Sequence, residues 1–159
     1  MQAKILVVDD HEIVRAGVRG LLKESRPEWE ISGEAANGKD AIEAVKSLRP
    51  DVVILDIAMP YMSGLEAAAR IAKLDLGARV LLFSMYESET LSSEARNAGA
   101  HGYVAKSQAA RQLIAAIDRL LAGGTYFGTS GPEPKSEKKI SASGGLLRRI
   151  DLGLLLVPA

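Results

Sequence analysis

The stretch VVILDIAMP, residues 52–60, predicts a short buried strand that ends in a carboxylate. Its branched apolar residues lie between two prolines, as expected of a central strand that is covered on both faces. Asp56 then lies at the carboxyl end of this strand, where open α/β sheets place their binding sites. A second apolar run, residues 5–8, ends in Asp9 and Asp10. The sequence therefore predicts that three carboxylates converge at one edge of a sheet.

The rest of the first 124 residues alternates between branched apolar runs and segments with helical spacing of apolar residues. Strands are expected at residues 4–9, 29–36, 52–56, 79–84 and 102–105. Helices are expected at residues 12–23, 41–48, 65–71 and 89–97, with a last one between Ser107, as its N-cap, and Gly123. Ser63 and Glu66 fit a capping box. Short connections between these elements predict an α/β fold, a doubly wound five-stranded parallel sheet with helices on both faces.

Composition indicates a globular protein with a sizeable core, since 47% of the residues are hydrophobic and 25% are charged. The formal net charge is zero, so no general attraction to nucleic acid or membrane is implied. The chain has no Cys, which excludes disulfides and thiolate metal sites. It also has no signal-peptide pattern and no apolar run near the ~18 residues of a membrane span. We expect a cytoplasmic protein that does not enter a membrane.

The chain divides by composition into three parts. Residues 3–123 hold the alternating strands and helices and form the predicted domain. Residues 124–145 are rich in Gly, Ser, Pro and Lys, which is typical of a flexible linker. Residues 146–159 form a short apolar tail, too small to be an independent domain.

The polar strand ends indicate a phosphoryl-transfer site. Asp9, Asp10, Asp56, Ser84 and Lys106 all follow predicted strands and should lie on one edge of the sheet. Crowded carboxylates either raise one another's pKa or bind a cation, and hard oxygen ligands suit Mg²⁺. A carboxylate nucleophile can then form an aspartyl-phosphate. We interpret the neighbouring His11 as an exposed residue at a helix start rather than a metal ligand.

This arrangement resembles the receiver domain of two-component response regulators. The resemblance covers residues 3–123 and rests on the acids above, Met59-Pro60 and Gly64 in the loop after Asp56, Ser84, and Lys106-Ser107. The stretch DDHEIVRAGV, residues 9–18, is similar to the NarL/FixJ (LuxR-type) subgroup. The resemblance to receiver domains implies a flavodoxin-like (CheY-like) fold with strand order 2-1-3-4-5.

The resemblance also implies roles for individual residues. A sensor histidine kinase would phosphorylate Asp56. Mg²⁺ would be held by Asp9, Asp10, Asp56 and the backbone carbonyl of Ala58. Lys106 would contact the phosphoryl oxygens, while Ser84 and Tyr103 would act as the switch. Homodimerisation would use the face formed by the fourth helix, the last strand and the last helix.

Two other chemistries fit the sequence poorly. Phosphatases and phosphotransferases of the haloacid-dehalogenase type carry a second acid two residues after the nucleophile, where this chain has Ala58. A flavin or nucleotide binder would need a phosphate-binding loop after the first strand, where residues 9–12 would repel phosphate. We therefore expect no enzyme, apart from self-phosphorylation and autodephosphorylation at Asp56.

The output of the protein has two possible readings. The region after Gly124 is too short for the helix-turn-helix domain of NarL/FixJ regulators and shows no basic recognition helix, so DNA binding is not expected of this chain. It is either a receiver that acts through protein contacts or a LuxR/NarL-type transcription regulator that has lost its DNA-binding domain.

Overall fold

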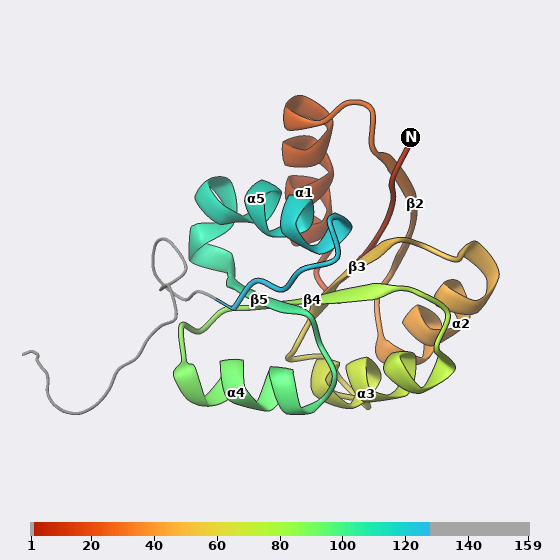
Figure 1. Ribbon diagram of the computed structural model, residues 1–159, viewed down its shortest axis with the longest axis vertical. Coiled ribbons are helices and arrows are strands. Elements are labelled where there is room, and N and C mark those ends of the chain that lie inside the picture. Colours follow the sequence, from red (N-terminus) through yellow and green to blue (C-terminus); the bar gives the residue numbers. More distant parts are fainter. Residues whose placement is uncertain (1, 128–159) are drawn as a thin grey trace, which may run out of the picture. The chain divides into compact units, whose positions relative to one another are not determined.

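The computed structural model describes residues 2–127, which alternate strictly between strands and helices (Figure 1). The strands are β1 (Lys4–Val8), β2 (Glu30–Ala35), β3 (Val52–Asp56), β4 (Arg79–Ser84) and β5 (Gly102–Ala105). The helices are α1 (Glu12–Ser25), α2 (Gly38–Leu48), α3 (Gly64–Leu74), α4 (Glu89–Asn97) and α5 (Ala109–Leu121), with a 3-10 turn, η1 (Lys106–Gln108), before α5. The predicted elements are all present, and their bounds either match the prediction or differ from it by at most three residues.

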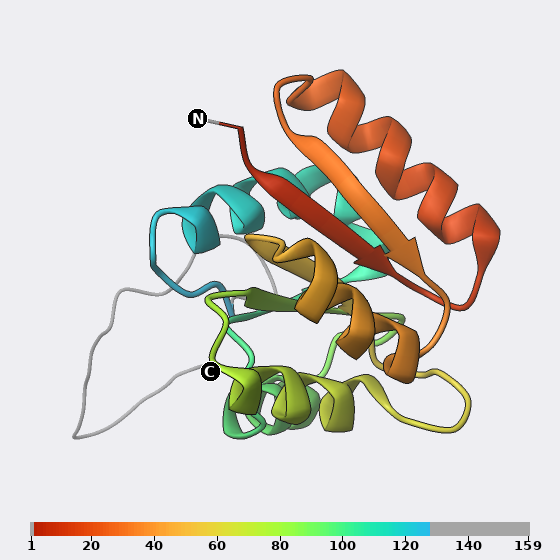
Figure 2. The same ribbon diagram turned by 90° about the vertical axis from the view of Figure 1, so that its right-hand side faces the viewer.

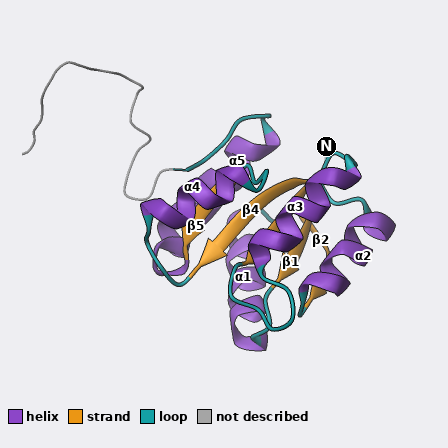
Figure 3. Cartoon of the chain, turned by 90° about the horizontal axis from the view of Figure 1, so that it is seen from below, coloured by secondary structure: helices purple, strands orange, loops and turns teal. Residues whose placement is uncertain are grey.

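All strand pairs are parallel, and the sheet has the order β2-β1-β3-β4-β5. Figure 2 shows β1 (dark red) and β2 (orange) side by side at one end of the sheet. Helices α1 and α5 cover one face and α2, α3 and α4 cover the other (Figures 1 and 3). The predicted doubly wound α/β fold is confirmed, including the strand order that the resemblance implied.

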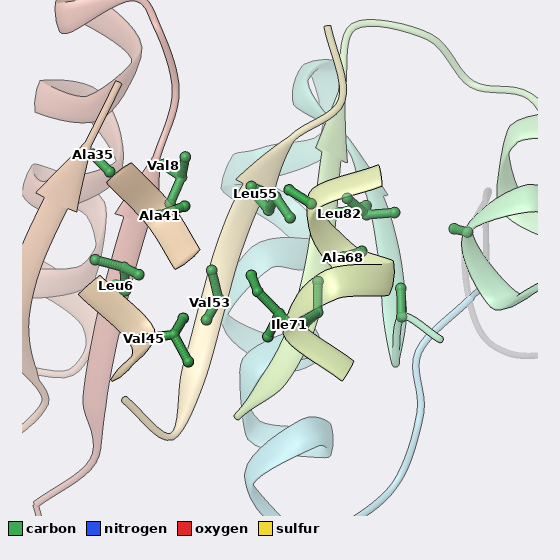
Figure 4. Close-up of a cluster of buried hydrophobic side chains, with 14 of the residues drawn as sticks. Leu6, Val8, Ala35, Ala41, Val45, Val53, Leu55, Ala68, Ile71 and Leu82 are labelled. Carbon is green, nitrogen blue, oxygen red and sulfur yellow. The ribbon is translucent and has the colours of Figure 1, made fainter. Parts of the chain in front are cut away.

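Each central strand divides its side chains between two core layers. Leu6, Val53 and Leu82 point to the layer beneath α2, α3 and α4, where Ala41 and Val45 of α2 lie against the sheet (Figure 4). The residues between them on these strands face α1 and α5 instead. Successive residues of a strand point to opposite faces, so a strand covered on both sides is apolar at every position. This explains why the sequence has continuous apolar runs rather than alternating ones.

In the described part of the chain, three helix starts are capped by a side chain, and the predicted cap at Ser63 is one of them. Asn37, Ser63 and Ser88 accept hydrogen bonds from backbone N–H groups in the first turns of α2, α3 and α4. The predicted cap at Ser107 is wrong, because Ser107 lies within η1 and Gln108 precedes α5 without a side-chain cap. The chain tightens into a 3-10 turn directly after β5, which moves the start of α5 along the sequence.

The segment after α5 returns to the sheet. Tyr126 forms a parallel bridge with Gly102, donates its N–H to the His101 carbonyl at 2.9 Å and accepts from the Tyr103 N–H at 2.8 Å. Phe127 packs against the core layer beneath α4. The described fold thus includes residues 124–127, which the sequence analysis assigned to the start of the linker. The rest of that linker, and the predicted apolar tail at 146–159, lie outside the described residues.

Within residues 2–127, no helix combines the length and apolar character that crossing a membrane requires.

Candidate functional site

The end of β1 supplies two carboxylates to the carboxyl edge of the sheet. Asp9 is buried, with 1% of its surface exposed, whereas Asp10 is only partly covered. The backbone N–H of His11 donates to Asp9 Oδ1 at 2.9 Å. The His11 ring is 67% exposed, as predicted for a residue that precedes α1, but its Nδ1 lies 3.1 Å from Asp10 Oδ1. The turn after β1 therefore gathers two acids and an imidazole.

Asp56 ends β3 in the middle of the sheet and is buried, with 2% of its surface exposed. The ammonium of Lys106, from the first residue after β5, lies 2.8 Å from Asp9 Oδ2 and 3.2 Å from Asp56 Oδ1. The strand order explains why Lys106 lies near Asp9 and Asp56. Strands β1 and β4 are both neighbours of β3, and β5 lies next to β4. The structure thus brings the predicted nucleophile, acid and lysine together.

The environment of Asp56 disfavours its charge. Burial raises the pKa of its carboxyl, and the nearby Asp9 carboxylate raises that pKa further, while Lys106 opposes both effects. Burial lowers the pKa of Lys106, but its contacts with Asp9 and Asp56 outweigh that effect and raise the pKa overall. A buried carboxyl group whose charged form is favoured mainly by one ammonium gains strongly from a second cation.

The donor set fits a divalent cation. Ligand atoms of Asp9, Asp10, His11 and Asp56 all lie within 4.8 Å of one another. The three carboxylates supply hard oxygen atoms, and one ammonium from Lys106 leaves them with an excess of negative charge. These side chains are suited to Mg²⁺, which the sequence analysis named. The Ala58 carbonyl stays a predicted ligand, while the Ala58 N–H lies 3.4 Å from Asp56 Oδ1 as a weak donor.

The loop after β3 approaches the site closely at Gly64, the first residue of α3. A Cβ atom at this position would lie 2.0 Å from the backbone oxygen of Asp56. The Gly64 N–H donates to the Ile57 carbonyl at 2.7 Å, which ties the start of α3 to the end of β3. Only glycine leaves room for this approach, so Gly64 allows the start of α3 to pack directly against the backbone of Asp56.

The two predicted switch residues lie on adjacent strands. Ser84 ends β4, is buried, and its hydroxyl oxygen accepts from the Tyr86 N–H at 3.1 Å. Tyr103 of β5 is buried within the core layer beneath α4, and its hydroxyl donates to the Tyr86 carbonyl. Both residues therefore contact the same loop residue after β4. Their switching stays a prediction.

Sequence reasoning missed two residues beside the site. Arg15 of α1 donates to the backbone carbonyl of Asp9 at 2.6 Å and to Glu34 of β2 at 2.9 Å. The spacing of Glu12 and Arg15 is a signal for an ion pair on one helix face. No local signal indicates Glu34, because it meets Arg15 only through the pairing of β1 with β2.

Comparison with known proteins agrees with this geometry. Residues 5–118 match the response regulator receiver domain family. The response regulator UvrY of Escherichia coli strain K12 is 34% identical over 123 residues, which cover 77% of this chain and 56% of UvrY. The nitrate/nitrite response regulator protein NarL of the same strain is 37% identical over 121 residues, 76% of this chain and 56% of NarL. The chain thus matches just over half the length of each relative.

Solved structures show the same fold. The crystal structure of a two-component response regulator of the LuxR family from Aurantimonas sp. SI85-9A1 has a TM-score of 0.75 and 39% identity. That similarity covers 79% of this chain and 89% of the other.

Proposed function

This chain belongs to the response regulator receiver domain family, and on that premise we propose that Asp56 accepts a phosphoryl group from a sensor histidine kinase. The observation that carries the proposal is the placement of Asp56. Its buried carboxylate ends the central strand, within 3.2 Å of a lysine ammonium and beside a second buried carboxylate. In such a site a charged nucleophile is kept reactive by neighbours that do not themselves react.

In the proposed transfer, an Asp56 carboxylate oxygen forms a bond to phosphorus. The bond from phosphorus to the donor's leaving nitrogen breaks, and the electron pair of that bond stays with the nitrogen, which takes up a proton. Lys106, which contacts Asp56 Oδ1 before transfer, is placed to pair with an equatorial oxygen of the phosphoryl group. The product is an acyl phosphate on this chain, so the protein is an acceptor and modifies itself.

Asp9, Asp10 and Asp56 would hold Mg²⁺ through carboxylate oxygens, together with the Ala58 carbonyl. When bound, the ion supplies positive charge that offsets the repulsion between these carboxylates and an incoming phosphoryl group. Asp9 and Asp56 are already oriented by Lys106, so the side chains need little rearrangement to bind a cation.

The surface around this edge of the sheet is suited to a protein phosphodonor. Ile13, Tyr61, Met85 and Tyr86 are large apolar residues with at least 65% of their surface exposed. They follow β1, β3 and β4, so all of them lie near the carboxyl edge of the sheet that carries Asp56. Exposed apolar residues that gather around a reactive group are typical of an interaction site.

Phosphorylation would act on α4, β5 and α5 through Ser84 and Tyr103. Both residues contact Tyr86, so a movement of Ser84 toward a new phosphoryl group would disturb the partner of the Tyr103 hydroxyl. A homodimer through this face would have to accommodate Tyr126, which bridges to β5, and Phe127, which packs against the core layer beneath α4. The predicted cytoplasmic location stays a prediction.

DNA-linked output is a second candidate function. UvrY and NarL continue well beyond the region that they share with this chain, which favours a regulator whose receiver controls a separate domain. Binding of the purified chain to promoter DNA, with nonspecific DNA as competitor, tests this candidate. Our proposal for the chain itself is a receiver that acts through protein contacts, and specific DNA binding would replace it.

Intact mass after incubation with acetyl phosphate tests the phosphoacceptor proposal. We expect a gain of one phosphoryl group that requires Mg²⁺ and is lost in Asp56→Asn. Asp75→Asn is a matched control, because it removes an exposed carboxylate at the end of α3. A gain of mass in Asp56→Asn equal to that of the wild type would contradict the assignment of Asp56.

A further inference from the structure

We infer that Arg15 is a positioning residue that holds the Asp9–Asp10 turn in the geometry that binds a divalent cation. The inference rests on the proposed function of the acidic site, but it assigns a role to a helix residue that touches neither the cation nor the phosphoryl group. Its guanidinium donates to the backbone carbonyl of Asp9 at 2.6 Å.

The Asp9 carbonyl lies where β1 no longer has sheet support. The ladder between β1 and β2 ends at the pair Val8 and Ala35, and the Asp9 N–H makes the last bond to β2, at 3.1 Å to the Ala35 carbonyl. The next peptide group, which joins Asp9 to Asp10, therefore needs a partner from outside the sheet. Arg15 provides it. The orientation of that peptide group sets the direction of the Cα–Cβ bond of Asp10.

The guanidinium is itself held on its other sides. Nε donates to Glu34 at 2.9 Å, and the remaining nitrogen pairs with Glu12. The Arg15 side chain is 15% exposed and its bond to the Asp9 carbonyl is partly buried, whereas its partner Glu12 is 66% exposed and open to solvent. The planar guanidinium directs donors on separate nitrogens to three acceptors at fixed angles, whereas the three donors of a lysine ammonium rotate about a single nitrogen. Arginine is thus suited to this position by its shape as well as its charge.

Arg19 provides a control within the same network. It pairs with Glu34 and Glu12, as Arg15 does, but within residues 2–127 its hydrogen bonds and ion pairs do not include the Asp9 carbonyl. Loss of either arginine removes one positive charge from the neighbourhood of the acids. By charge alone, both losses would tighten the binding of a cation. Positioning by Arg15 predicts the opposite result for Arg15 only.

The test is the dissociation constant for Mg²⁺, measured by titration calorimetry on the unphosphorylated full chain. We expect Arg15→Lys, which keeps the charge, to raise the dissociation constant about tenfold, as removal of groups that orient metal ligands commonly does. Arg15→Ala should also raise it, although loss of the positive charge offsets part of the effect, and Arg19→Ala should leave it unchanged or lower it.

Phosphorylation by acetyl phosphate gives an independent readout. The Mg²⁺ concentration for half-maximal rate should rise in Arg15→Lys by the same factor as the dissociation constant, while the rate at saturating Mg²⁺ stays at the wild-type value. Because calorimetry needs no phosphorylation, failure of the proposed function would not hide the result.

Two outcomes overturn the inference. One is a folded Arg15→Lys protein, checked by circular dichroism, that binds Mg²⁺ as tightly as the wild type. The other is an equal loss of affinity in Arg19→Ala, which would show that the network acts on the fold rather than on the turn. If Arg15→Ala does not fold, Arg15→Lys alone decides.

Discussion

At the scale of single residues, the charge of Asp56 works against the stability of the fold. Burial and Asp9 raise the pKa of this carboxyl above its ordinary value of 3.8. The folded protein therefore binds the proton more tightly than the unfolded chain does. The stability that this group contributes is fully present below the ordinary pKa and is lost as pH rises through the raised pKa. Above the raised pKa the charged carboxylate destabilises the protein, although the proposed phosphoryl transfer uses this charged form.

Asp56→Asn should consequently increase the free energy of unfolding at pH 7 in metal-free buffer. Each unit by which the pKa is raised corresponds to about 1.4 kcal/mol. The gain should shrink as pH falls toward the ordinary pKa of aspartate, where the wild-type group is neutral as well. Urea denaturation at several pH values, with Asp75→Asn as the control, measures this change in the free energy of unfolding. An Asp56→Asn protein less stable than the wild type at pH 7 would contradict this reading.

Gly64→Ala should destabilise the protein by about 3 kcal/mol, since overpacking of a rigid site carries that order of penalty. The added Cβ would overlap the backbone oxygen of Asp56, and backbone cannot yield as a side chain can. Gly17→Ala is the matched control, because nothing lies within 4 Å of a Cβ there and α1 should gain about 0.5–1 kcal/mol. Thermal denaturation of both variants checks the pair. Similar melting temperatures would show that the chain relaxes around Gly64.

At the scale of elements, the segment after α5 acts as a short addition to the sheet. Tyr126 bonds to the backbone on both sides of Gly102, and the Arg79 guanidinium donates to the Gly124 carbonyl at 2.7 Å. The Arg96 guanidinium of α4 lies over the Phe127 ring, 4.0 Å from its centroid. These contacts connect α4, β4 and β5 to residues 124–127. A change at Tyr103 would therefore act directly on this segment, because the Tyr103 N–H donates to the Tyr126 carbonyl.

Phe127→Ala should lower the free energy of unfolding by about 1–3 kcal/mol, because a partly buried ring leaves the core and the cation–π contact is lost. Arg96→Ala should lower it by less than about 1 kcal/mol, since it removes only the second of these contributions. Chemical denaturation of the two variants compares them. Equal effects would mean that the ring contributes little through packing.

At the scale of the whole molecule, cation binding and folding should be coupled. The acids come from β1 and β3 and meet only when the sheet is formed, so Mg²⁺ binds the folded state in preference to the unfolded chain.

Addition of Mg²⁺ should therefore raise the melting temperature, and a chelator should reverse the rise. At 100 times the dissociation constant the stabilisation is about 2.7 kcal/mol. Scanning calorimetry with Na⁺ at matched ionic strength separates this effect from screening. The rise should be much reduced in Asp10→Asn; a full rise in that variant would place the ion elsewhere.

The sequence by itself determined the order and type of the elements, the doubly wound sheet and the acids at its carboxyl edge. These follow from local patterns, because an apolar run predicts a strand covered on both faces and the residue after it must lie at the strand's end. Strand order entered through family resemblance. The predicted Ser107 cap failed because the chain forms a 3-10 turn over Lys106–Gln108, so that α5 begins only at Ala109.

Only the tertiary structure decided which of these residues touch. Lys106 reaches Asp9 and Asp56 across strands that are far apart in sequence, and Arg15 meets Glu34 through the pairing of β1 with β2. The return of Tyr126 to β5 has no local signal either, because its stretch is rich in glycine and reads as a linker. Such contacts depend on strand register and side-chain direction, which are set when distant segments pack together and leave no periodic trace in the sequence.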